Sequence, residues 1–239
     1  MEFDVVTIFP EIVERPLERT ILRRAIDRGL IQVRVHQLRD HAEGPHSRVD
    51  DEPFGGGGGM VMKPEPIFRA VESIARDYPR KSSRTILLSP QGTRLDHDQA
   101  VRLSLHERLI LICGRYEGVD ERIRESLVDE EISIGDYVLT GGDLAALVLI
   151  DCVSRLLPGV VGEGESVLRD SFVDGVLQYP QYTRPAVYRD MRVPEVLLSG
   201  NHHEIEKWRE SMALKNTRKR RPDLLARAGA RSSRRVRSQ

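Results

Sequence analysis

Two short apolar runs, TILL at residues 85–88 and LILIC at residues 109–113, indicate the class of fold. Neither run alternates with polar residues, and strands buried on both faces of a parallel sheet have this unbroken apolar pattern. A helix is expected between them, beginning near Asp96. Strands separated by a helix favour an α/β fold with a mainly parallel sheet.

The flanking residues extend this alternation of strand and helix. Helical spacing of apolar residues over residues 12–26 stops at Gly29 and predicts one long helix. Residues 141–156 are apolar almost all round, which predicts a buried helix or a helix at an interface. The other expected elements are a strand at residues 3–9, a strand at residues 31–35 and a helix at residues 64–75.

The composition changes after residue 159. Residues 160–170 are small, polar and glycine-containing, which is typical of a linker. A helix is expected from about residue 201 to residue 220, with Ile205, Trp208, Met212 and Leu214 near one stripe. We therefore divide the chain into a main domain at residues 1–159, a flexible interdomain linker at residues 160–172, and a helical domain with a basic tail at residues 173–239.

The charge is distributed unevenly, although the formal net charge is zero. Residues 215–239 contain ten Lys or Arg and one acidic residue, a net charge of +9, so the rest of the chain carries −9. A basic end on a neutral protein is typical of contact with phosphates. We assign residues 215–221 to nucleic-acid binding, and the residues from 231 onward to a solvated, partly disordered tail.

No run of residues approaches the roughly 20 apolar residues needed to cross a bilayer. The first residues also lack the basic-then-apolar pattern of a signal peptide. Cys113 and Cys152 each lie in an apolar stretch, so we interpret them as small buried residues rather than a disulfide or a metal pair. A soluble cytoplasmic protein is expected.

Three glycine-containing loops follow the predicted strands, at residues 88–92, 113–120 and 133–143. In parallel α/β sheets, ligands bind beyond the carboxyl ends of the strands, and glycines there let the backbone approach a ligand closely. A single glycine would be explained as well by a tight turn. Three such loops together favour a ligand pocket.

The loops match none of the common phosphate, metal or nucleophile motifs. GxGxxG, GxxxxGK[ST], HExxH, paired CxxC and GxSxG are all absent from the sequence. The pocket should therefore hold its ligand with backbone groups and a few side chains. The missing phosphate-binding loop counts against an α/β enzyme that binds another adenine nucleotide.

Seven segments of the chain, spread over most of its length and in the same order, resemble bacterial TrmD-type tRNA (guanine-N1)-methyltransferases. They are PFGGGGGMVMKPEPI (53–67), LLSPQG (87–92), CGRYEGVDERI (113–123), ISIGDYVLTGGD (132–143), RDSFVDG (169–175), QYTRP (181–185) and VPEVLLSGNH (193–202). Departures are small: Phe54 stands where Tyr is usual, Gly58 where Pro is frequent, and Asp143 where Glu is common. The basic residues after 231 lie outside the pattern.

The resemblance implies the fold of the SPOUT superfamily, an α/β domain with a deep trefoil knot. Patterning alone would argue against a knot, because knotted chains are rare. The resemblance also implies a homodimer whose active sites lie at the subunit interface. The apolar residues 141–156 agree with an interface helix, although a buried core helix has the same pattern.

The family binds S-adenosylmethionine as methyl donor, and the resemblance implies that the three loops hold it in a bent shape. The implied donor-binding residues are Ser89, Pro90, Gly92, Gly114, Tyr116, Glu117, Ile134, Gly135, Asp136, Tyr137, Val138, Leu139, Gly141 and Gly142. For the carboxylates of Asp51, Asp120 and Asp136, helix capping or loop bracing is the stronger interpretation. No metal site is predicted, and the sequence leaves open whether magnesium assists the chemistry.

The chemistry implied by the resemblance needs a base, because guanine N1 carries a proton, and a group that stabilises negative charge on O6. Asp170 matches the family's base and Arg155 its charge-stabilising arginine. From the residues alone, Asp170 would be a helix N-cap before Ser171, and Arg155 a surface arginine at the end of the apolar helix. Asp174 is a second candidate for the base.

The family methylates the guanosine 3′ of the anticodon, at tRNA position 37, and enzymes that modify a base must extract it from its stack. The expected RNA contacts on the helical domain are Arg184, Asn201, His202, Lys207, Arg209, Lys215, Arg218, Lys219 and Arg220. The alternative function is a non-catalytic RNA-binding protein, which would not need the three glycine loops.

Overall fold

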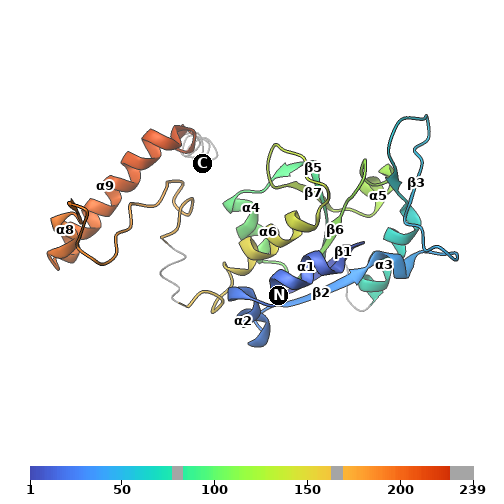
Figure 1. Ribbon diagram of the computed structural model, residues 1–239, viewed down its shortest axis with the longest axis horizontal. Coiled ribbons are helices and arrows are strands. Elements are labelled where there is room, and N and C mark those ends of the chain that lie inside the picture. The colour runs from blue at the N-terminus through green and yellow to red at the C-terminus, as the bar shows by residue number, and fades with distance from the viewer. Residues whose placement is uncertain (77–82, 163–168, 227–239) are drawn as a thin grey trace, which may run out of the picture. The chain divides into compact units, whose positions relative to one another are not determined.

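The computed structural model describes residues 1–76, 83–162 and 169–226 (Figure 1). The chain separates into two compact units, Met1–Gly164 and Glu165–Gln239, and their boundary falls within the linker predicted at residues 160–172. Residues 163–168 of that linker and the tail from residue 227 lie outside the described residues. In the part of the chain that is described, no helix is long and apolar enough to cross a membrane.

The first unit is built on a five-stranded sheet in the order β2-β1-β6-β5-β7, and every pair in it is parallel. Its strands are β1 (Glu2–Thr7), β2 (Gln32–Gln37), β5 (Ser83–Arg94), β6 (Arg108–Cys113) and β7 (Glu130–Ser133). All six residues of β6 are buried, as the unbroken apolar run predicts for a central strand. The predicted α/β class with a mainly parallel sheet is confirmed.

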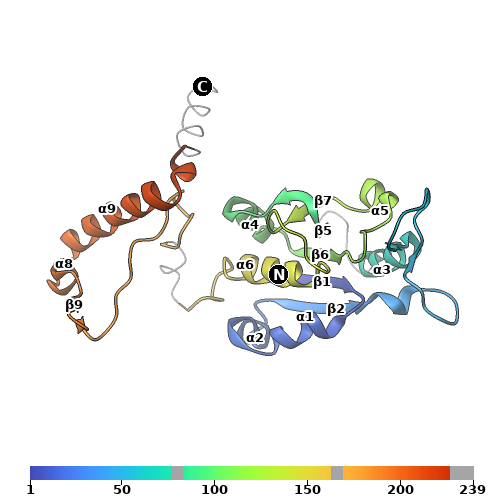
Figure 2. The ribbon, with the colours of Figure 1, turned by 45° about the horizontal axis from the view of Figure 1, so that its top comes forward.

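Helices cover both faces of this sheet (Figure 2). One face packs against α1 (Pro10–Leu17), α2 (Thr20–Asp27), α4 (His97–Ser104) and α6 (Asp143–Ser154), and the other against α3 (Pro64–Arg76) and α5 (Glu121–Ser126). Because side chains alternate along a strand, Ile86 and Leu88 belong to the first core and Leu87 to the second. The helices expected near Asp96 and at residues 64–75 are confirmed as α4 and α3.

The single long helix predicted over residues 12–26 is wrong, because the chain forms α1 and α2 with a break between them. Arg19 is extended, and Thr20, the first residue of α2, has a φ of 69°, which lies outside the right-handed helical region and interrupts a continuous helix. Pro16 lies inside α1, where it removes a backbone donor and disfavours continuation of the helix. The apolar spacing continues across the break, so periodicity alone does not reveal it.

The apolar helix at residues 141–156 is α6, and only one of its faces is buried in the chain. Ala146, Leu149 and Ile150 lie in the core, whereas Leu144 is 53% exposed and Val148 46% exposed. A helix that is apolar all round is buried on all sides in a stable protein. Among the residues that the structure describes, nothing covers this second, apolar face of α6.

The second unit is small and is organised around one long helix. Its elements are the strands β8 (Val187–Tyr188) and β9 (Met191–Arg192), which form a hairpin, and the helices α8 (Glu195–Leu198) and α9 (His202–Arg220). The helix expected at residues 201–220 is confirmed as α9. Ile205, Ala213 and Thr217 are its buried residues, so the buried stripe does not include Leu214, which is exposed.

Small elements complete the first unit next to the carboxyl end of the sheet. The short 3-10 helix η1 (Leu38–His41) follows β2, and β3 (Asp50–Asp51) pairs with β4 (Val61–Met62) in a two-stranded ribbon. The five glycines at residues 55–59 form the loop of this ribbon. Met62 is buried in the second core, which fixes the ribbon to the sheet.

Gly92 lies where β5 changes its pairing with β7. Leu88 and Thr93 both align with Ile132, so the intervening residues bulge out of the ladder. A β-carbon on Gly92 would come within 2.4 Å of the backbone of Glu131 and Ile132. The absence of a side chain is therefore required for the two strands to meet.

We expect Gly92→Ala to destabilise the first unit by about 1–3 kcal/mol, the usual cost of forcing extra volume into packed surroundings. Gly58→Ala is the matched control, because a β-carbon there meets nothing within 4 Å. Urea unfolding of the two variants and the unchanged chain measures the difference. Equal midpoints for Gly92→Ala and Gly58→Ala would contradict this role of Gly92.

Candidate functional site

A cavity of about 230 Å³ lies beyond the carboxyl ends of β5, β6 and β7. The three glycine loops that follow these strands form its walls, as expected for an α/β sheet. Twelve of the fourteen residues predicted to bind the methyl donor line this one cavity. They are Ser89, Pro90, Gly114, Tyr116, Glu117, Ile134, Gly135, Tyr137, Val138, Leu139, Gly141 and Gly142.

Two of the predicted residues, Gly92 and Asp136, do not line the cavity. Gly92 instead permits the contact between β5 and β7. The Asp136 side chain is exposed, with a carboxylate oxygen 4.0 Å from a guanidinium nitrogen of Arg94. Asp136 is thus placed to brace its loop.

Several lining residues were not among those predicted from the sequence. They include Arg115, Val119, Arg124, Ile132, Thr140 and Ala145. Arg115, Val119, Ile132 and Thr140 lie within the quoted motifs, whereas Arg124 directly follows the motif at 113–123 and Ala145 follows the motif at 132–143 by two residues. The motifs therefore contained most of these residues. They do not distinguish a residue that faces the cavity from one that faces the core.

The loop after β6 and the loop before α6 are joined directly. The Gly142 amide donates a hydrogen bond to the Gly114 carbonyl oxygen at 2.9 Å, and Arg115 forms an isolated bridge with Gly141. A β-carbon on Gly142 would lie 2.9 Å from the Cys113 Cα atom. Gly142 therefore lets two loops that are distant in sequence touch at the backbone.

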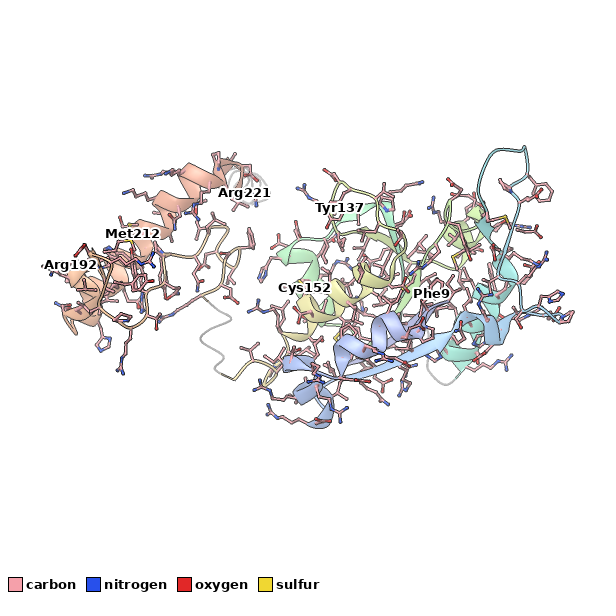
Figure 3. The ribbon with its side chains drawn as sticks, viewed as in Figure 1. Phe9, Tyr137, Cys152, Arg192, Met212 and Arg221 are labelled. Carbon is pink, nitrogen blue, oxygen red and sulfur yellow. The ribbon has the colours of Figure 1, made fainter. Side chains whose placement is uncertain are left out.

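Asp143 anchors the start of α6 beneath this contact. Its carboxylate is buried and accepts hydrogen bonds from Arg115 Nη2 at 2.7 Å, from Arg115 Nε at 3.1 Å and from the Thr7 hydroxyl. The Arg115 guanidinium also lies 4.4 Å from the ring centroid of Phe9, which is labelled in Figure 3. β1, the loop after β6 and α6 are thus tied together by one buried ion pair.

The β4 ribbon holds the loop after β6 from the other side. The Glu117 amide donates to Met60 O at 3.0 Å, the Met62 amide to Gly118 O at 2.9 Å, and the Asp120 amide to Met62 O at 3.0 Å. Tyr116 is held at a φ of 60°, a conformation that is uncommon outside glycine and that concentrates at functional sites. The hydrogen bonds to the ribbon therefore fix the position of this loop.

The predicted capping role of Asp120 is confirmed. It is the N-cap of α5, and its carboxylate accepts a hydrogen bond from the Arg122 amide at 3.0 Å. The Arg122 guanidinium beside it lowers the pKa of this carboxyl. Asp51 accepts a hydrogen bond from the Glu52 amide at 2.9 Å, which is a local brace of the ribbon.

The charges around the cavity favour a ligand that is not phosphorylated. Arg115 is paired with Asp143, and Arg124 lies 3.2 Å from Glu131 and 3.4 Å from Glu121, so both lining arginines have carboxylate partners. The exposed carboxylate of Glu117 adds negative charge at the cavity. A neutral or cationic ligand fits these surroundings better than a phosphate does.

The loop before α6 presents apolar side chains to solvent at the cavity. Tyr137, labelled in Figure 3, is 56% exposed, and Val138 is 82% exposed. The Tyr137 amide donates to Gly135 O at 2.9 Å, which curls the loop back on itself. Exposed apolar residues next to a cavity are typical of surfaces that a ligand or a partner covers.

The cysteines differ in their surroundings. Cys113 is fully buried at the end of β6, and this burial raises the pKa of its thiol well above the ordinary value. Cys152 on α6 is only half-buried, so the prediction of a buried residue holds for Cys113 alone.

The two predicted catalytic residues belong to different units. Arg155 is exposed at the C-cap of α6 in the first unit, and Asp170 is half-buried in the second. Residues 171–174 form a turn and not a helix, so the interpretation of Asp170 as an N-cap at that point is wrong.

Asp170 lines a second cavity, of about 400 Å³, inside the second unit. Asp174, the other candidate for the base, lines it too, together with Tyr179 and Arg209. The Arg209 guanidinium lies 5.0 Å from the Tyr179 ring centroid and 2.6 Å from Glu206. Both candidate carboxylates therefore face one hollow surface.

The predicted RNA contacts fall into two groups. Three have partners within the unit: Asn201 caps α9, Lys207 lies 3.2 Å from Glu204, and Arg209 is paired with Glu206. The others are exposed, namely Arg184, His202, Lys215, Arg218, Lys219 and Arg220. The last three form the C-terminal turn of α9, where cations also stabilise the helix dipole.

Known proteins resemble this chain over almost its whole length. A family model described as tRNA (Guanine-1)-methyltransferase TrmD matches residues 1–227. The tRNA (guanine-N(1)-)-methyltransferase of Geobacter sulfurreducens is 53% identical over 98% of this chain and 94% of its own length. The proteins of the same name from Geotalea uraniireducens and Dehalococcoides mccartyi are 56% and 54% identical, each over 94% of this chain and 90% of their own length. The chain therefore belongs to the tRNA (guanine-N1)-methyltransferase family.

Proposed function

We propose that this chain transfers a methyl group from S-adenosylmethionine to N1 of the guanosine at tRNA position 37, 3′ of the anticodon. The observation that supports this most directly is the meeting of twelve expected donor-binding residues around one cavity. A non-catalytic RNA-binding protein would have no use for such a cavity. The assignment of S-adenosylmethionine, of the target base and of each residue's role is part of the proposal.

The residues around the cavity suit this donor. Backbone amides and carbonyls of the three loops can bind the edge of an adenine, while Leu88, Val119 and Ile132 supply apolar walls. S-adenosylmethionine carries an electrophilic methyl group on a positively charged sulfur, and Glu117 places a carboxylate at the cavity for that charge. Gly114 leaves open the space between the Leu88 carbonyl and the Val119 side chain, where the nearest atoms are 3.7 Å and 3.8 Å from a built β-carbon.

Asp170 is proposed as the general base. A carboxylate accepts the N1 proton of guanine as the methyl group arrives, which turns a poor nucleophile into an adequate one. Asp170 lies near the start of the second unit, within the predicted linker, so movement of this unit would deliver it to the target base. Arg155 is proposed to stabilise the negative charge that develops on O6.

We propose that two copies of the chain form the active enzyme. The exposed apolar face of α6, with Leu144 and Val148, supplies a surface for a second copy. Val138 and Leu139 add exposed apolar area beside the donor cavity. A dimer through these surfaces would place each cavity at the subunit interface and cover them. We also propose that the contact between Gly142 and Gly114 is part of the family's trefoil knot.

The second unit is proposed to bind tRNA. The exposed Arg218, Lys219 and Arg220 at the end of α9 provide a positive patch for phosphates. Lys215 and Arg184 are exposed as well. The substrate would place the protein in the cytoplasm, where tRNA is modified.

Incubation of the chain with S-adenosylmethionine and an unmodified tRNA transcript is expected to yield N1-methylguanine in the digested RNA, measured by mass spectrometry. A transcript in which the guanosine at position 37 is replaced by adenosine is the control and should remain unmethylated. A methylated base at any other position, or no methylated guanine, would contradict the proposed function.

Gly114→Val is expected to abolish donor binding, because its branched side chain would fill the space that the glycine leaves open. Calorimetry with S-adenosylmethionine in the absence of RNA measures the loss. Gly58→Val is the control, since Gly58 lies outside the cavity lining and a β-carbon there meets nothing. Unchanged affinity in Gly114→Val would contradict the assignment of this cavity to the donor.

Asp170→Asn is expected to lower the rate of methyl transfer about 100-fold or more while both substrates still bind, since the amide cannot accept the N1 proton. Single-turnover kinetics at saturating tRNA separates the chemical step from binding. Asp174→Asn is the matched control, because its carboxylate lines the same cavity. If Asp174→Asn loses the rate and Asp170→Asn keeps it, the roles of the two carboxylates are reversed.

A further inference from the structure

The hairpin formed by β8 and β9 is a second surface on the small unit with the properties of an RNA contact. Every residue from 181 to 192 is exposed, although this stretch contains aromatic and large apolar side chains. Tyr188 is 55% exposed and Met191 is 64% exposed. The stretch carries three arginines and one acidic residue, a net charge of +2.

The tip of the hairpin holds an arginine in a conformation that suits glycine. Arg189 and Asp190 form the two-residue turn, with φ angles of 50° and 62°. Hairpin turns of this kind favour Asn-Gly or Asp-Gly, because non-glycine residues pay a steric cost at positive φ. Stability alone would therefore favour glycine over arginine at position 189.

The Arg189 side chain lies beside the neighbouring aromatic ring. Its guanidinium carbon is 5.3 Å from the ring centroid of Tyr188. Arg192 follows on β9 and is also exposed, so the hairpin presents two guanidinium groups and one aromatic ring together. Unpaired bases in RNA loops stack on aromatic rings and on guanidinium planes, and their phosphates attract the charge.

The hairpin is separated from the basic end of α9. It lies at the end of the unit where α8 and the start of α9 meet, while Arg218–Arg220 lie at the far end of α9 (Figure 2). A helix of 19 residues is about 28 Å long at about 1.5 Å per residue. The unit can therefore contact one RNA at two points.

We propose that the β8–β9 hairpin binds unpaired nucleotides of the tRNA substrate, with Tyr188 stacking on a base and Arg189 and Arg192 contacting the base or its phosphates. The end of α9 then contacts backbone phosphates elsewhere on the same molecule. This inference rests on the proposed function for the identity of the RNA. This surface fits a negatively charged partner with exposed ring faces. A protein partner would have to bury the positive charge of the hairpin without compensation.

The test measures the affinity of the full chain for an unmodified tRNA transcript by fluorescence anisotropy, without methyl donor, over a range of salt concentrations. Tyr188→Ala should weaken binding about tenfold, whereas Tyr188→Phe, which keeps the ring, should bind like the unchanged chain. Arg189→Gly should weaken binding and lower the slope of log affinity against log salt by about 1. Glycine suits the positive φ at this position, so misfolding of the turn cannot explain that loss.

Asp190→Asn is the matched control in the same turn, and it should bind tRNA at least as tightly as the unchanged chain. A fully paired RNA duplex should show no effect of Tyr188→Ala, since its bases are not available for stacking. If Tyr188→Ala and Arg189→Gly both bind tRNA within twofold of the unchanged chain, the proposal is overturned. Loss of self-association in these variants at unchanged RNA affinity would instead assign the hairpin to an interface between copies.

Methyl transfer by the unchanged chain to the same transcript is measured as well. It distinguishes failure of the hairpin proposal from failure of the proposed function. If the unchanged chain methylates the tRNA while the hairpin variants keep full affinity, only the hairpin proposal fails. If the unchanged chain binds tRNA through the hairpin but does not methylate it, only the proposed function fails.

Discussion

The buried ion pair between Arg115 and Asp143 is the interaction on which the candidate site depends. It joins the loop after β6 to the start of α6, and the Thr7 hydroxyl connects the same carboxylate to β1. Removing one partner of a buried pair leaves an uncompensated charge, which typically costs about 3–5 kcal/mol. The pair therefore connects two of the loops that form the cavity walls.

The glycines of the site act for different physical reasons. Gly142 and Gly92 are required by neighbouring backbone, since a β-carbon at either position would collide with main-chain atoms. Gly114 has no such neighbour, and the space beside it belongs to the cavity. Gly92 thus lets two strands pack together, Gly142 lets two loops touch, and Gly114 leaves open space at the cavity. Of these three, Gly114 alone lines the cavity without a backbone neighbour that a β-carbon would strike.

The second unit uses its charged residues in two ways. Lys207 and Arg209 form ion pairs with carboxylates on the same helix, and Arg209 also covers the Tyr179 ring. In contrast, the basic residues at the end of α9 and on the hairpin extend into solvent. Exposed pairs on a helix contribute little to stability. Two of the basic residues expected to contact RNA, Lys207 and Arg209, therefore already have carboxylate partners on α9.

Local sequence determined the class of fold and the position of the site. The apolar runs ending at Leu88 and Cys113 are buried strands, because a continuous apolar pattern has no other stable placement in a parallel sheet. The glycine loops at their carboxyl ends form the predicted cavity for the same topological reason. The sequence also placed α9 to within a residue of its observed start, since Asn201 is a favourable N-cap.

Features that depend on contacts between distant residues were determined only by the tertiary structure. The break between α1 and α2 follows from backbone angles at Arg19 and Thr20 that apolar spacing does not encode. The engagement of Arg115 by Asp143 joins residues 28 positions apart, so no local pattern predicts it. The same reason explains why Gly92 packs against β7 and does not line the cavity: its neighbours are Glu131 and Ile132, and the strand register alone brings them together.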